Sequence, residues 1–139
     1  MSRSHGWVGC GGEPGAGQQA KAVVETVDGG RTWSTRSATG GGAVGRLFGS
    51  DYLEGISMWP SGTGFLWMGR GTTAMTRDGG RTWTAIGPGS PDVVIPLAAA
   101  TVDDRTWFAL VWDGNEQAQV LHMTEDSGST WRRVAELAR

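Results

Sequence analysis

Short stretches rich in aromatic and β-branched residues, separated by glycine-rich turns, run along this chain. They are clearest in the middle of the chain, where four follow one another: 55–62 (GISMWPSG), 64–71 (GFLWMGRG), 72–80 (TTAMTRDGG) and 81–87 (RTWTAIG). Such stretches bounded by glycine are typical of β-strands joined by tight hairpins. A helical period is absent except in the last residues, RRVAELAR. The pattern therefore predicts an all-β protein.

The same plan recurs on both sides of this unit. The C-terminal unit offers strands at 97–104, 106–114, 118–128 and 129–137. The N-terminal unit offers only three, at 6–10, 21–30 and 31–37. We therefore expect eleven strands, with the first unit beginning at its second strand.

One octapeptide appears once in each unit. It reads TVDGGRTW at 26–33, TRDGGRTW at 76–83 and, more loosely, TEDSGSTW at 124–131. Its final tryptophans are 50 and 48 residues apart, a period that indicates a repeat architecture and, for a β-rich chain, the blades of a propeller. The residues shared by the three copies are Thr26, Asp28, Gly30, Thr32, Trp33, Thr76, Asp78, Gly80, Thr82, Trp83, Thr124, Asp126, Gly128, Thr130 and Trp131.

These shared residues suit a hairpin between a third and a fourth strand. The aspartate accepts hydrogen bonds from backbone N–H groups two or three residues further on, and glycine supplies the positive φ of a tight turn. The tryptophan ring then covers the hairpin and the adjacent sheet. A calcium loop would need more oxygen ligands, and a phosphate loop would lead into a helix, so we interpret the motif as structural.

The three copies resemble the Asp-box, or BNR, repeat (Ser/Thr-x-Asp-x-Gly-x-Thr-Trp) of sialidase-like β-propellers. With GW or GF near the second strand, the chain is most similar to the photosystem II stability/assembly-factor-like proteins of bacteria and plastids. The resemblance implies a partial propeller of about three four-stranded antiparallel blades, at 6–37, 55–87 and 97–137, in one domain covering residues 1–139. It also implies that the boxes lie away from any ligand face, and relatives of this kind are often exported.

Composition narrows the function classes. The formal net charge is −2 and Lys21 is the one lysine among twelve basic residues, which lie scattered, so we expect no nucleic-acid partner. Cys10 is the single cysteine, which excludes an internal disulfide and a cysteine-based zinc cluster. We expect no membrane span, export signal, metal site or cofactor in this stretch of sequence.

A sialidase-like site would combine three arginines, a Tyr–Glu pair and an aspartate, because guanidinium groups bind a carboxylate in a bidentate manner. Tyr52, the only tyrosine, lies beside Asp51 and close to Glu54, and we interpret this cluster as a polar loop between units. The other arginines and carboxylates that we considered for such a site show no spacing that groups them. They are Arg31, Arg46, Arg70, Arg81, Arg105, Asp92, Asp103 and Asp104.

Histidines and the other tryptophans are interpreted as packed residues. His5 and His122 are too far apart in sequence to suggest a metal site, and His122 stands in the register of Val24 and Ala74 in the other units. Trp59, Trp67 and Trp112 could line a sugar or peptide surface, but aromatics at such places more often fill the space between blades.

The sequence thus favours a non-catalytic module that binds or scaffolds a protein or glycan. The alternative is a fragment of a sialidase-like or other glycoside hydrolase, whose remaining blades would carry the missing catalytic residues. Because three blades do not close a ring, we also expect that two copies could complete a six-bladed ring as a homodimer.

Overall fold

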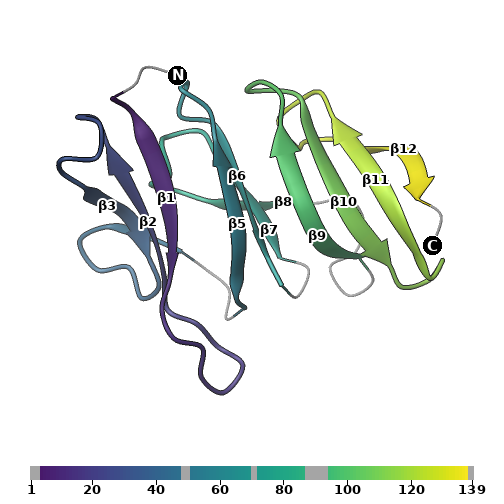
Figure 1. The fold of residues 1–139 in the computed structure, drawn as a ribbon, viewed down its shortest axis with the longest axis horizontal. Coiled ribbons are helices and arrows are strands. Elements are labelled where there is room, and N and C mark those ends of the chain that lie inside the picture. Colours follow the sequence, from purple (N-terminus) through teal and green to yellow (C-terminus); the bar gives the residue numbers. More distant parts are fainter. Residues whose placement is uncertain (1–3, 48–50, 70–71, 87–93, 138–139) are drawn as a thin grey trace.

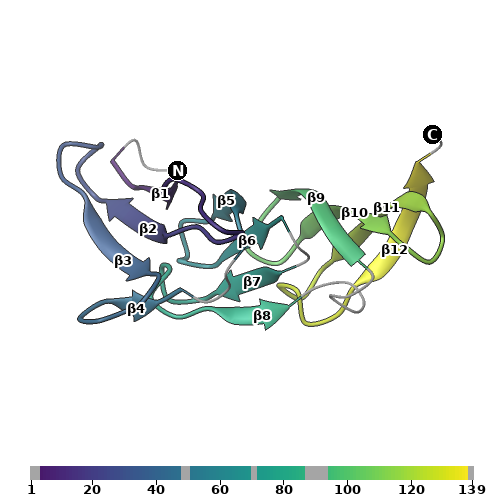
Figure 2. The same cartoon turned by 90° about the horizontal axis from the view of Figure 1, so that it is seen from below.

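Three β-sheets stand side by side in chain order in a computed structural model of the protein (Figure 1). It describes residues 4–47, 51–69, 72–86 and 94–137. These residues form strands, turns and loops without a helix. Seen from below, β1, β5 and β9 lie along one side of the molecule, whereas β4 and β8 lie along the other (Figure 2). The strand order within each sheet thus runs from one side to the other, as in successive propeller blades.

Each sheet contains four strands, and neighbours in the chain are neighbours in the sheet. The first sheet consists of β1 (Gly6–Gly11), β2 (Lys21–Thr26), β3 (Ser34–Ala38) and β4 (Gly45–Arg46). The second consists of β5 (Leu53–Met58), β6 (Gly64–Met68), β7 (Thr73–Thr76) and β8 (Thr84–Ile86). The third consists of β9 (Val94–Thr101), β10 (Trp107–Asp113), β11 (Ala118–Thr124) and β12 (Arg132–Leu137).

The strand β4 was not expected, so the described residues form twelve strands and not eleven. It pairs with β3 in parallel, whereas every other pairing is antiparallel. The octapeptide follows β2 in the first sheet, β7 in the second and β11 in the third. By this register β1 corresponds to β6 and β10, so the first sheet has no counterpart of β5 or β9 and gains β4 at its opposite edge.

The register between the second and third strands is the same in all three sheets. The first threonine of the octapeptide pairs with Gly6 in the first sheet, Gly64 in the second and Trp107 in the third. Trp7, Phe65 and Phe108 therefore occupy equivalent positions, one residue further along the strand. Trp107 precedes Phe108 and lies on the opposite face of its sheet, because side chains alternate along a strand.

Apolar cores fill the spaces between the sheets. The first lies between the first and second sheets and includes Val23, Leu66, Met68 and Trp83. Another lies between the second and third sheets and is built around Phe65, Met75 and Trp107. A third group lies on the third sheet against Trp131 and contains Ala109, Val111, Ala118 and Val120. The middle sheet is thus covered on both faces, which explains why β6 and β7 are buried along most of their length.

The strand β4 passes close to the second sheet. A Cβ atom on Gly45 would lie 1.8 Å from the carbonyl oxygen of Arg81 and 3.0 Å from that of Arg36. Only glycine fits there without a backbone shift. We expect Gly45→Ala to lower the free energy of unfolding in urea by about 1–3 kcal/mol, as overpacking usually does.

The matched control is Gly15→Ala, because a Cβ at Gly15 meets no atom within 4 Å. It should leave the unfolding free energy unchanged to within about 0.5 kcal/mol. Equal effects of the two substitutions would show that β4 does not pack against the second sheet in this way.

Candidate functional site

The three octapeptide loops share one hydrogen-bond network. In the second loop, Thr76 Oγ1 donates to Asp78 Oδ1 at 2.8 Å and accepts from the Gly80 N–H at 3.0 Å. The Asp78 carboxylate also accepts from the Thr82 N–H at 2.9 Å and from Thr82 Oγ1 at 2.6 Å. The Trp83 indole N–H then donates to the Gly80 carbonyl at 3.1 Å. The same bonds recur in the other two loops, around Asp28 and Asp126.

A further bond ties each loop to its own sheet. The N–H of the residue after the aspartate donates to a carbonyl near the start of β1, β6 or β10. The acceptor lies two residues before that strand begins. The three bonds are Gly29 to Ser4 at 2.8 Å, Gly79 to Gly62 at 2.9 Å and Ser127 to Arg105 at 3.0 Å. This contact could not be predicted from the sequence, because the acceptor is a backbone carbonyl and the residue that carries it differs in every copy.

The carboxylates are held in their charged form. Hydrogen bonds from the Thr32 side chain and N–H lower the pKa of Asp28 from 3.8 to about 2. Thr130 does the same for Asp126, whose pKa also falls to about 2. Burial opposes this effect at Asp78, yet the bonds from Thr82 still lower its pKa. Three ionised acceptors thus close three hairpins, and none is poised to exchange a proton near neutral pH.

The second and third loops pack against the sheet that precedes them. Trp83 is 9% exposed and its indole N–H reaches Ser37 Oγ on β3 at 3.0 Å. The Trp131 ring lies 6.1 Å from the Phe65 ring of the second sheet. The first loop has no preceding sheet among the described residues, and its Trp33 is 46% exposed. The loop closes in the same way in all three copies, but only two copies are covered.

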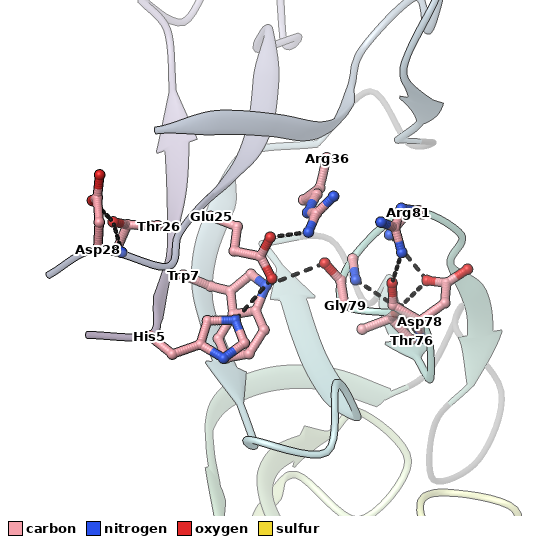
Figure 3. A network of polar contacts seen from close by, with 11 residues as sticks. His5, Trp7, Glu25, Thr26, Asp28, Arg36, Thr76, Asp78, Gly79 and Arg81 are labelled. Carbon is pink, nitrogen blue, oxygen red and sulfur yellow. Dashed lines mark hydrogen bonds and ion pairs between the residues drawn. The ribbon is translucent and has the colours of Figure 1, made fainter. Parts of the chain in front are cut away.

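A polar cluster lies where the first two sheets meet (Figure 3). Glu25 on β2 accepts from His5 Nε2 at 2.8 Å and forms an ion pair with Arg36 on β3. The side chain of Glu25 is 7% exposed, against 32% for His5 and 24% for Arg36. Beside it, Trp7 donates its indole N–H to the Gly79 carbonyl of the second loop at 3.2 Å. This cluster joins the two sheets, and the spacing of these residues in the sequence did not predict it.

The expected loop around Tyr52 is partly wrong, because β5 begins at Leu53 and Glu54 belongs to that strand. Asp51 is 8% exposed, accepts from Thr72 Oγ1 at 3.0 Å and offers its carbonyl to Lys21 Nζ at 2.6 Å. Burial lowers the pKa of Lys21, and the Asp51 carboxylate partly opposes that shift. Both groups are thus used in packing between the first and second sheets.

The other catalytic candidates are dispersed. Arg31, Arg81 and Arg105 are exposed in three different loops, and Arg46 is exposed on β4. No hydrogen bond or ion pair in the described parts of the chain brings two of these four to one acceptor. The Asp103 carboxylate accepts from the N–H groups of Arg105 and Thr106 and closes the turn after β9. Asp104 follows it in that turn, and Arg70 and Asp92 lie outside the described residues.

Both histidines have a structural setting. His122 lies on β11 opposite Ala109 and Arg133, and its Nδ1 atom is buried without a hydrogen-bond partner. Burial, with the nearby Arg133 charge, lowers its pKa. It is therefore a neutral strand histidine, as its register suggested, while His5 is the partner of Glu25.

The other tryptophans lie in three different settings. Trp67 stacks on Phe65 between the second and third sheets. Trp59 lies in the turn between β5 and β6, and Trp112 is half-buried on β10. Of the three, Trp67 thus fills space between sheets, as expected.

The third loop borders a hollow of about 330 Å³. Its lining includes Arg105, Met123, Glu125, Trp131 and Arg132. Acidic and basic groups line it together, so its charge favours neither an anion nor a cation. Within the described residues, no group of three or more His, Cys, Asp or Glu side chains could hold a metal ion, and no helix could cross a membrane.

Two solved structures share this fold. One is YCF48 bound to D1 peptide, with a TM-score of 0.63 and 23% identity over 95% of this chain. The other is YCF48 from Cyanidioschyzon merolae, with a TM-score of 0.57 and 16% identity over 95% of this chain. No protein-family model and no curated protein matches the sequence.

This likeness defines the chain as a segment of a β-propeller. It covers 36% and 40% of the two YCF48 chains, so the segment corresponds to less than half of either. At these identities the likeness concerns the fold. It agrees with the expected similarity to photosystem II assembly-factor-like propellers at that level.

The loop network predicts a stability effect at its carboxylate. Asp78→Ala leaves the N–H groups of Arg81 and Thr82 and two threonine hydroxyls without their acceptor. We expect the free energy of unfolding in urea to fall by about 1–3 kcal/mol. Glu13→Ala, at an exposed loop position, is the control and should be neutral. A neutral Asp78→Ala would mean that the carboxylate does not hold the loop.

The lowered pKa values predict an acid dependence. Asp28 and Asp126 have a pKa of about 2 when folded, below the ordinary 3.8. Their stabilisation is therefore fully present above pH 4 and is lost as the pH falls through about 2. Thermal unfolding between pH 6 and pH 2 should show a steeper loss for the natural protein than for the double variant Asp28→Asn, Asp126→Asn. Parallel curves would contradict the assignment.

Proposed function

We propose that this chain is a non-catalytic Asp-box propeller segment that binds a protein partner, which adds an extended strand to the first sheet. The observation that carries the proposal is the open inner edge of β1. The second and third sheets begin with β5 and β9, and their second strands are β6 and β10. In the first sheet β1 takes the place of β6, and no described strand pairs with its other edge.

The chemistry of β1 suits an incoming strand. Its sequence, GWVGCG, carries no charge and three glycines, so its backbone groups are accessible. Val8 is 43% exposed and Cys10 is exposed. An edge without charged residues pairs readily with another extended chain, which supplies main-chain hydrogen bonds for affinity.

The opposite edge of the molecule differs. The strand β12 carries Arg132, Arg133 and Glu136, and Arg133 forms ion pairs with Glu136 and with Glu116. Charged side chains on an edge strand hinder pairing with a further strand. The contrast supports β1 as the edge at which a partner segment binds.

The fifteen shared residues of the three octapeptides serve as structural Asp-boxes, and the blades at 6–37, 55–87 and 97–137 form one partial domain. The partner is a protein and not a glycan, which is in keeping with the D1 peptide bound to the similar YCF48. No observation in the described residues favours the glycoside hydrolase alternative.

A peptide that imitates an inner strand tests the proposal. A synthetic peptide of residues 51–60 contains β5, the inner strand of the second sheet. We expect it to bind saturably, because it offers the missing strand. Amide hydrogen exchange should slow at Gly6–Gly11 on binding and remain unchanged at Arg132–Leu137.

The control peptide has the same sequence with alternate backbone nitrogens methylated, which removes edge hydrogen bonds and keeps the side chains. It should bind at least about tenfold more weakly, since several main-chain bonds are lost. Equal binding of the two peptides, or protection at β12 in place of β1, would overturn edge pairing as the mode of recognition.

A further inference from the structure

We infer that the free face of the first sheet in one copy of this chain docks on the free face of the third sheet in a second copy, and the reverse, giving a closed pair of six sheets. This docking involves sheet faces and not the β1 edge, so it does not depend on peptide binding at that edge.

The chain already contains this interface twice. One side of each interface, the loop side, is formed by the octapeptide tryptophan and glycine. In the second loop Trp83 lies against Ser37, and a Cβ on Gly80 would lie 3.2 Å from Val23. The third loop repeats the arrangement against the second sheet. There a Cβ on Gly128 would lie 2.4 Å from Ile86.

The other side, the aromatic side, is formed by an aromatic residue on β1 or β6 of the preceding sheet. Trp7 on β1 contacts the second loop through its bond to the Gly79 carbonyl. Phe65 does so for the third loop, 5.4 Å from the Trp107 ring and 6.1 Å from the Trp131 ring. Every internal interface thus joins a box loop of one sheet to the second-strand aromatic of the sheet before it.

The third sheet presents a free aromatic side. Phe108 stands in the register of Trp7 and Phe65, opposite Met123 as Phe65 is opposite Met75. Trp107 packs towards the second sheet, so by strand alternation this set points the other way. Its apolar residues are half-buried: Phe108, Leu110, Trp112, Leu121 and Met123.

The first sheet presents a free loop side. Trp33 is 46% exposed, compared with 9% for Trp83. Gly29 and Gly30 are exposed, whereas Gly79 and Gly80 in the second loop are buried. A Cβ on Gly30 would meet within 4 Å only the ring of Trp33 itself. The loop is therefore formed and uncovered.

A second copy is the occupant that fits both faces at once. Among its described residues each copy has one uncovered loop side and one uncovered aromatic side, which are the two halves of its own internal interface. Closed propellers have four to eight blades, so the three described sheets do not close a ring, whereas six can. A two-fold pair lets each half meet its complement and leaves no face open.

The solution mass of the 139-residue chain tests the inference, by sedimentation equilibrium over a range of concentrations. We expect a dimer. Trp33→Asp should raise the dissociation constant more than about 100-fold, because an aromatic anchor is lost from each of the two interfaces. Phe108→Asp should do the same from the other side.

Val27→Arg is the matched control. Val27 is 65% exposed in the same loop, and its counterparts Arg77 and Glu125 are exposed in loops that have a sheet to pack on. This variant should dimerise like the natural chain. Trp33→Asp should still unfold cooperatively at low concentration, because among the described residues Trp33 packs on no other sheet and loses only its bond to the Gly30 carbonyl.

Mixing the two monomeric variants provides a second test. Trp33→Asp retains an intact aromatic side and Phe108→Asp an intact loop side, so their mixture should contain a heterodimer that neither forms alone. A monomer at all concentrations, a dimer indifferent to both substitutions, or larger open assemblies would each overturn the closed pair.

Discussion

The packing of an octapeptide tryptophan on the preceding sheet is the interaction on which this architecture depends. A sheet that is apolar on both faces must be covered on both, and here the covering element comes from the following repeat. The ring is positioned locally, because its indole N–H donates to the carbonyl of the shared octapeptide glycine in every copy. The Asp78 carboxylate therefore acts across sheets: by closing its own hairpin it sets the place at which Trp83 meets Ser37.

This division between local and distant causes explains what the sequence could predict. The strands, the repeat and the loop chemistry were predictable because they depend on residues close together in the chain. The strand β4 was not, because it is two residues long and depends on the close approach of Gly45 to the backbone of Arg81. The pairing of Glu25 with His5 and Arg36 was missed for the same reason, since its members lie 20 and 11 residues apart.

Buried charged residues between the first and second sheets have structural partners, which bears on the absence of an assembled catalytic set among the described residues. Glu25 is paired with His5 and Arg36, and Lys21 binds the carbonyl of Asp51. Removing one member of such a pair would leave a buried charge without compensation, which is strongly destabilising. The octapeptide aspartates are likewise occupied by hydrogen bonds within their own loops. The proposed binding uses surfaces that the described residues leave uncovered: a strand edge and two sheet faces.

The first loop shows that these open surfaces are preformed. Asp28 makes the same bonds to Thr26 and Thr32 as its counterparts make, although no described sheet covers Trp33. The octapeptide loop therefore closes without contact from a neighbouring sheet. Association at this face would order no further loop, so little of the interaction energy would be lost to conformational entropy. The loop side of the first sheet is therefore complete before contact. A sheet that offers the matching aromatic side can dock on it without rearrangement of the loop.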